Sequence, residues 1–98
     1  MKPLSEILYK AGITEVVGTT SEEVCAVTAD SRMVAPGGVF VAVKGVHSDG
    51  HKYIPSAVAS GATAIVCEEF PSLLDENVVW IKVSDSSISL GHIASNFY

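Results

Sequence analysis

Two histidines and a carboxylate alternate within five positions of this chain, at His47, Asp49 and His51. Imidazole and carboxylate groups are good ligands for zinc or iron, so the segment admits a metal site. Together with Ser31 it also admits a hydrolase triad of Ser31, His47 and Asp49. Neither interpretation has further support, because only His92 remains as another histidine and no G-x-S-x-G nucleophile motif occurs.

A second polar group, Asp30-Ser31-Arg32, follows the apolar run at 24–29. The Ser31 hydroxyl can donate and accept hydrogen bonds, and the loop backbone around it can offer N–H groups to a uracil, a ribose or a phosphate. The same residues also suit a turn in which Asp30 and Ser31 cap backbone groups. Arg32 suits either a phosphate or an acidic partner such as Asp30.

The elements that must hold these residues follow from the apolar pattern. Four apolar runs have the character of buried strands, at 24–29, 39–43, 64–67 and 78–83. Helical spacing predicts three helices, at 3–12, at 54–61 and from Asp85 or Ser86 to the end. Residues 13–23 could hold a short strand, but no clear pattern identifies one.

Strands that alternate with helices predict an α/β fold, a three-layer domain with a largely parallel or mixed sheet. The turn Ala35-Pro36-Gly37-Gly38 has proline where φ is restricted and glycine where φ must be positive. In such a fold, ligands bind just past the carboxyl ends of strands. The polar segments 28–32 and 45–51 both follow strands, so we expect them to meet if those strands are neighbours.

Composition narrows the classes of function. The 98 residues predict one domain over 1–98, and 48% hydrophobic against 17% charged residues favours a folded chain. A net charge of −5 with scattered basic residues argues against nucleic acid as a partner. No apolar run approaches the roughly 20 residues that cross a bilayer, so we expect no membrane partner and a cytoplasmic location. Cys25 and Cys67 lie in apolar runs and are predicted to be buried free thiols.

One longer pattern is specific. It starts as Ala29-Asp30-Ser31-Arg32, includes the Pro36-Gly37 turn and the run Val39–Lys44, and ends in Gly45 and Asp49-Gly50-His51. This pattern resembles the opening signature of the Mur ligases, which extend the peptidoglycan peptide. The closing segment Leu90–Tyr98 resembles the MurE type of that family, and the MurF type is the alternative.

The resemblance implies the N-terminal domain of a MurE-type ligase. That domain binds the uridine diphosphate end of UDP-N-acetylmuramoyl-L-alanyl-D-glutamate, the UDP-N-acetylmuramoyl-dipeptide substrate. The full-length enzyme is then an ATP-dependent amide ligase that uses ATP and Mg²⁺ to add the third peptide residue. Such an enzyme acts in peptidoglycan biosynthesis, and so in cell wall biogenesis, cell shape and cell division. By position, the resemblance assigns substrate contacts to five residues: Ala29, Ser31, Val46, His47 and Ser48.

No catalytic residue, metal ligand or cofactor is expected in this segment, which should be inactive alone. Neither G-x-x-x-x-G-K-[ST] nor G-x-G-x-x-G occurs, so the remaining ligase domains, including the ATP-binding and C-terminal domains, are expected in the same chain beyond Tyr98. Some family members have histidine directly after the glycine that corresponds to Gly45. Val46 takes that place here, so backbone contacts are expected to persist while the part played by the His47 ring stays open.

Two other classes of function remain as alternatives: a free-standing nucleotide-binding module, and the small metal-dependent or serine hydrolase already described. The third amino acid, meso-diaminopimelate or L-lysine, and the oligomeric state are left open by the sequence.

Overall fold

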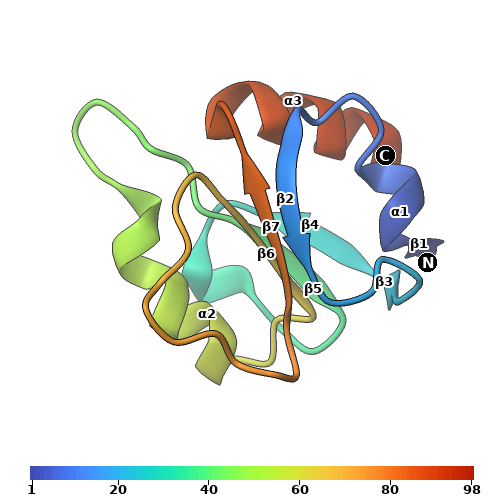
Figure 1. Cartoon of the computed structure of the whole chain (residues 1–98), viewed down its shortest axis with the longest axis horizontal. Helices are drawn as coiled ribbons and strands as arrows, with labels where there is room; N and C mark the ends of the chain where they lie inside the picture. The colour runs from blue at the N-terminus through green and yellow to red at the C-terminus, as the bar shows by residue number, and fades with distance from the viewer.

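A five-stranded sheet forms the centre of the computed structural model, which describes residues 1–98 (Figure 1). Its strands are β2 (Ile13–Val17), β4 (Ala26–Thr28), β5 (Gly38–Val41), β6 (Ala64–Cys67) and β7 (Val79–Val83). They lie in the order β2-β7-β6-β5-β4. Neighbours from β4 to β7 are parallel, whereas the edge strand β2 runs antiparallel to β7. The predicted α/β domain with a largely parallel or mixed sheet is confirmed.

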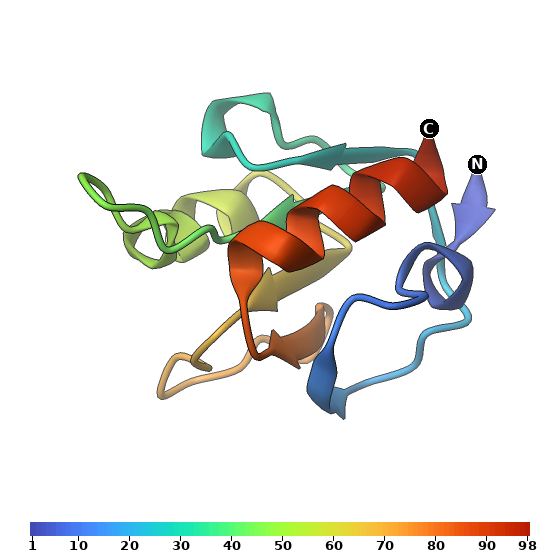
Figure 2. The ribbon, with the colours of Figure 1, turned by 90° about the horizontal axis from the view of Figure 1, so that it is seen from above.

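Helices cover both faces of this sheet, which makes three layers (Figure 2). They are α1 (Leu4–Ile7), α2 (Ile54–Ala59) and α3 (Ser86–Phe97). Side chains alternate along a strand, so Val39 and Val41 pack in the core that includes Ile93 of α3. Phe40, between them, packs in the second core with Ile54 of α2. Burial on both faces explains why these strands read as continuous apolar runs.

The expected strand at 24–29 is broken in the structure at Cys25. Val24 belongs to β3 (Glu23–Val24), which pairs with β1 (Lys2–Pro3) in a separate two-stranded sheet. Ala26 then begins β4. The break leaves Cys25 exposed, so its predicted burial is wrong, whereas burial of Cys67 is confirmed.

Local signals predicted the turn at 35–38 and the start of α3 correctly, but not the end of the first helix. Gly37 has a φ of +89°, and the Gly38 N–H donates to the Ala35 carbonyl at 2.9 Å, which confirms the turn. Asp85 caps α3, since its carboxylate accepts from the Ile88 N–H at 3.1 Å. The first helix is shorter than expected and ends at Ile7. Apolar spacing predicts a helix over 3–12, because the buried face of this segment continues through Leu8 and Ala11.

The two termini lie side by side, as both ribbon views show. The Lys2 ammonium donates to the Asn96 carbonyl at 2.9 Å. The Asn96 amide in turn donates to the carbonyls of Ile7 and Tyr9, at 3.0 and 2.6 Å. The end of α3 is therefore held against the start of the chain.

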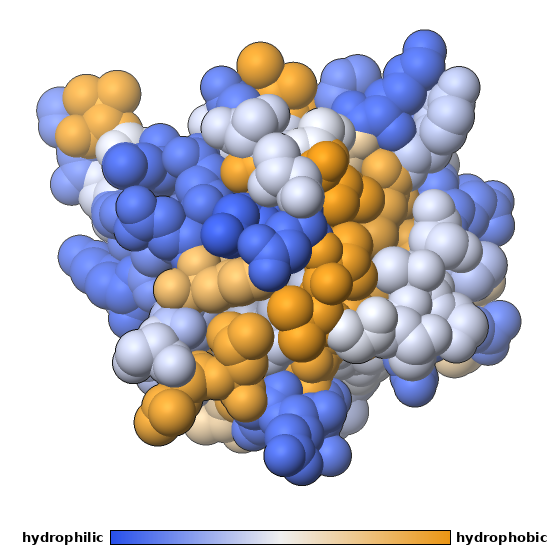
Figure 3. Space-filling view, in the orientation of Figure 1, coloured by the Kyte–Doolittle hydropathy of each residue, from blue (hydrophilic) through white to orange (hydrophobic).

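The β2 edge of the sheet carries exposed apolar side chains. Ile13, Val16 and Val17 keep 39%, 37% and 38% of their surface accessible. Figure 3 shows apolar residues gathered over this edge, beside the hydrophilic surface at the end of the sheet where β6 and β7 finish. None of the helices has the length and hydrophobicity needed to span a bilayer.

Candidate functional site

Because β4 to β7 are parallel, their carboxyl ends lie at one edge of the sheet. The segment Ala29–Arg32 follows β4, and the predicted polar segment 45–51 comes a few residues after its direct neighbour β5. The two polar segments predicted from the sequence thus leave the sheet from neighbouring strands. This edge is where an α/β sheet normally binds ligands.

The first segment forms a turn around Asp30. Its carboxylate accepts from the Arg32 backbone N–H at 2.9 Å and from the Arg32 guanidinium at 3.0 and 2.8 Å. Hydrogen bonds from the Arg32 side chain and backbone lower the pKa of Asp30. Of the two roles open to Arg32, the structure shows pairing with Asp30, on a largely exposed surface.

A hollow of about 470 Å³ lies beside this turn. It is lined by Ala29, Asp30, Ser31, Arg32 and Tyr53. Tyr53, which comes just before α2, keeps 42% of its surface exposed. The assignment of substrate contacts from the sequence did not include Tyr53. Its position two residues after the Asp49-Gly50-His51 group was the only signal that could have found it.

The second segment is a hairpin, which projects at the upper left of Figure 1. Lys44 and Asp49 pair across its base, and the Gly45 N–H donates to the Ser48 carbonyl at 3.0 Å. After the hairpin, the Gly50 N–H donates a hydrogen bond to the Val43 carbonyl at 2.8 Å. A Cβ at position 50 would lie 2.8 Å from the Val43 nitrogen, so this close approach requires glycine.

The tip of that hairpin, Val46, His47 and Ser48, points into solvent. Val46 is 96% exposed, and none of the three residues lines a hollow. The structure therefore brings Ala29 and Ser31 together but leaves the other three predicted contact residues apart from them. The two loops start at neighbouring strands, yet no hydrogen bond joins them.

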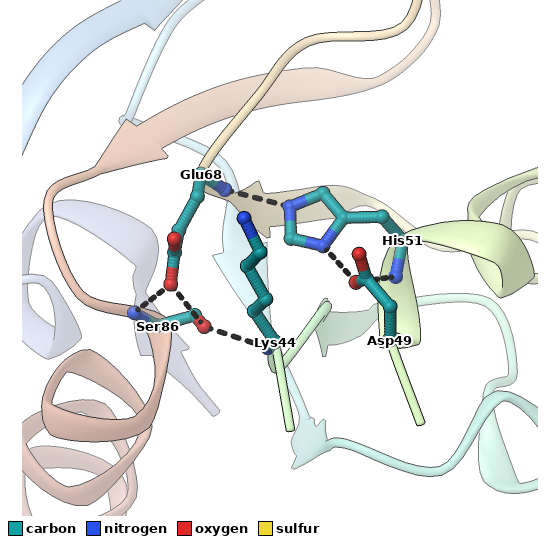
Figure 4. Close-up of polar contacts among 5 residues, drawn as sticks. All are labelled: Lys44, Asp49, His51, Glu68 and Ser86. Carbon is teal, nitrogen blue, oxygen red and sulfur yellow. Dashed lines mark hydrogen bonds and ion pairs between the residues drawn. The ribbon is translucent and has the colours of Figure 1, made fainter. Parts of the chain in front are cut away.

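His51 links the hairpin to the end of β6 (Figure 4). Its Nδ1 lies 2.6 Å from Asp49 Oδ1, and its Nε2 accepts from the Glu68 backbone N–H at 2.9 Å. Since Nε2 accepts a hydrogen bond, the proton of the neutral ring lies on Nδ1 and is donated to Asp49. Hydrogen bonds from the His51 backbone and ring lower the pKa of Asp49.

The Glu68 carboxylate makes a second connection in the same place. Ser86, at the start of α3, donates its N–H and its hydroxyl to Glu68 Oε2, at 2.9 and 2.7 Å. The Ser86 oxygen also accepts from the Lys44 N–H at 2.9 Å. The hydrogen bonds from the Ser86 backbone N–H and hydroxyl lower the pKa of Glu68. A hollow of about 280 Å³ beside this network is lined by lysines and carboxylates, including Lys44, Asp49 and Glu68.

This geometry does not support the two hydrolase alternatives. Asp49 pairs with His51 and not with His47, so a triad of Ser31, His47 and Asp49 is not assembled. No group of three or more His, Cys, Asp or Glu side chains is placed to hold a metal ion.

Comparison with known proteins agrees with the signature in the sequence. A family profile described as "Mur ligase family, catalytic domain" matches residues 23–98. This chain belongs to the Mur ligase family. The match covers all of the strands from β3 onward and both candidate loops.

Similar curated proteins are UDP-N-acetylmuramoyl-L-alanyl-D-glutamate–2,6-diaminopimelate ligases, the enzymes of the MurE type. The one from Phocaeicola vulgatus is 43% identical over 95 residues, which are 97% of this chain and 20% of that protein. The one from Cytophaga hutchinsonii is 45% identical over 96 residues, again 97% and 20%. The preference for the MurE type over the MurF type is confirmed. The chain spans about a fifth of the length of these relatives.

Similar solved structures are MurF ligases. A crystal structure of MurF from Acinetobacter baumannii matches with a TM-score of 0.62 and 26% identity, over 74% of this chain and 15% of that one. MurF from Thermotoga maritima in complex with ADP matches with a TM-score of 0.59 and 35% identity, over 70% and 16%. The MurF ligases thus share the fold of this chain over about three quarters of its length.

Proposed function

We propose that this chain binds the uridine diphosphate end of UDP-N-acetylmuramoyl-L-alanyl-D-glutamate for a ligase that adds the third residue of the peptidoglycan peptide. The observation that carries this proposal is the hollow beside Ala29–Arg32 at the carboxyl edge of the sheet. It lies beside the Ser31 hydroxyl and the Asp30–Arg32 pair. The hairpin that follows the neighbouring strand β5 carries the other three predicted contact residues, Val46, His47 and Ser48. The names of the MurE-type relatives support the identity of the substrate.

Tyr53 belongs to this proposal as the aromatic wall of the hollow. Its half-exposed ring offers a flat face on which a planar base can stack. The Ser31 hydroxyl and the backbone of its turn then supply hydrogen bonds to the base, the ribose or a phosphate.

Catalysis is proposed to lie outside these residues. The chain lacks the G-x-x-x-x-G-K-[ST] loop that holds ATP phosphates, and we assign ATP and Mg²⁺ to further domains of the same protein. The relatives indicate 2,6-diaminopimelate as the added amino acid. Binding a remote part of the substrate here would help to orient the reacting carboxylate elsewhere. The cytoplasmic location stays a prediction.

Titration of the ¹⁵N-labelled chain with UDP tests this function. We expect shifts in the backbone amide signals of residues 29–32 and 45–51, and no such shifts with ADP. Equal responses to both nucleotides, or none to either, would contradict the proposal.

The variant Tyr53→Ala is expected to weaken UDP binding roughly tenfold, because stacking contributes about 1–3 kcal/mol per base. Tyr98→Ala is the matched control, since Tyr98 is 80% exposed and lies at the far end of α3. Unchanged UDP affinity in Tyr53→Ala would remove Tyr53 from the site while leaving the rest of the proposal intact.

A further inference from the structure

The hairpin that carries Val46, His47 and Ser48 cannot fix its own position. Its tip makes one internal backbone hydrogen bond, from Gly45 to Ser48, and is otherwise exposed to solvent. Loops with few buried contacts open at little cost in free energy. The place of the tip relative to the Ala29–Arg32 turn therefore depends on how the base of the hairpin is tied to the sheet.

Both sides of the base are tied to the same residue. The Asp49 side is joined through the His51 ring to the Glu68 N–H, and the Lys44 side is joined through Ser86 to the Glu68 carboxylate. Figure 4 shows both connections meeting at the end of β6. The His51 side chain is only 17% exposed, so water competes poorly for its bond with the Glu68 N–H, whereas its partner Asp49 keeps 48% of its side chain accessible.

From this geometry we infer that His51 is a positioning residue for nucleotide binding. In its Nδ1–H form it bridges Asp49 to the end of β6 and holds the tip at residues 46–48 in place before the ligand arrives. This inference rests on the proposed function for its effect on affinity. A loop that is already ordered binds more tightly, because the ordering entropy is not lost on binding.

Two substitutions separate the two bonds of the ring. The amide of Asn reaches the position of Nδ1 and can bond to Asp49, but nothing then accepts from the Glu68 N–H. The amide of Gln reaches the position of Nε2 and restores that acceptor. His51→Asn should therefore release the hairpin from β6. His51→Gln should keep residue 51 bound to β6, and the Asp49 carboxylate still accepts the backbone N–H of residue 51 at 2.9 Å, so the hairpin should stay linked. His92→Asn, at an exposed position on α3, is the matched control for exchanging His for Asn.

The test uses the full 98-residue chain in two stages. Without ligand, backbone order parameters of residues 46–48 should fall below about 0.6 in His51→Asn and stay near wild type in His51→Gln and His92→Asn. With UDP, His51→Asn should bind about tenfold more weakly, the effect of one lost hydrogen bond of about 1.4 kcal/mol. His51→Gln should recover most of that affinity.

Each outcome decides a different point. Wild-type order at the tip in His51→Asn, or equal loss of affinity in His51→Asn and His51→Gln, would overturn the inference. Failure of the wild-type chain to bind UDP would instead count against the proposed function. The order parameters of residues 46–48 would still show whether His51 holds the hairpin to β6. If His51→Asn does not fold, ring ¹⁵N shifts of the wild type decide, because a proton on Nε2 is incompatible with the bridge.

Discussion

Ser86 donates both its backbone N–H and its hydroxyl to one oxygen of Glu68, at 2.9 and 2.7 Å. The pair joins the first residue of α3 to the residue that follows β6. A carboxylate at the start of a helix is favourable, because it accepts from unpaired N–H groups and lies at the positive end of the helix dipole. Ser86 is fully buried, so these bonds are protected from water.

Replacing Ser86 by Ala is expected to lower the free energy of unfolding by about 1–3 kcal/mol, since it removes a donor to Glu68 and leaves the Lys44 N–H without its acceptor. Urea unfolding followed by circular dichroism measures this. Ser87→Ala is the control, at the next and exposed position of α3. A loss of stability in Ser87→Ala equal to that in Ser86→Ala would show that the hydroxyl network is not responsible.

The lowered pKa of Glu68 predicts a dependence of stability on pH. A carboxyl whose folded-state pKa lies below its ordinary value of 4.5 stabilises the fold fully above pH 4.5. That contribution is lost as the pH falls from there through the folded-state pKa. Asp30 and Asp49 have an ordinary value of 3.8, so their contributions are lost at lower pH.

The variant Glu68→Gln should therefore flatten the fall in the free energy of unfolding between about pH 5 and pH 4. Thermal unfolding at closely spaced pH values measures the slope. Glu69→Gln makes the same change in net charge at an exposed neighbour and isolates the effect of Glu68. A slope in Glu68→Gln equal to that of the wild type would contradict the assigned network.

The two thiols should differ in reactivity. Burial raises the pKa of Cys67 to about 11, so almost no thiolate forms there at neutral pH. Cys25 is exposed. Iodoacetamide at about pH 8 should therefore modify Cys25 and leave Cys67 intact in the folded chain, whereas both should react in denaturant. Mass spectrometry of tryptic peptides reads out each site, and rapid labelling of Cys67 in the native chain would contradict its burial.

Gly37 should not tolerate a side chain. Its φ of +89° is unfavourable for other residues, and an added Cβ would lie 2.7 Å from Cys25 Sγ. Gly37→Ala is expected to cost about 1–3 kcal/mol of the free energy of unfolding. Gly91→Ala, in α3 with nothing within 4 Å of the new Cβ, should instead stabilise by about 0.5–1 kcal/mol.

A double variant, with Cys25→Ala and Gly37→Ala, separates the steric contact with Cys25 Sγ from the backbone strain at position 37. It removes the contact with sulfur but keeps the positive φ, so part of the free energy of unfolding that Gly37→Ala loses should return. Full recovery in the double variant would show that φ strain is absent.

Sequence reasoning identified the features that depend on neighbouring residues. The Pro36-Gly37 turn, the Asp85 cap and the buried runs at β5, β6 and β7 were all found, because each rests on local backbone preference or on continuous hydrophobicity. The prediction of one strand at 24–29 was wrong, because the chain changes sheets at Cys25. The change of sheet at that position is decided by pairing with β1, which no local pattern encodes.

The sequence by itself determined the α/β class, the order of the elements from β4 onward and the two polar loops that follow β4 and β5. Only the tertiary structure decided which side chains meet: Tyr53 with the Ala29–Arg32 turn, His51 with the Glu68 N–H, and Ser86 with Lys44 across 42 positions. The physical reason is that a hydrogen bond requires contact within about 3 Å. Contact between distant residues follows from strand order and register, which are set by the packing of the whole sheet and not by any one segment.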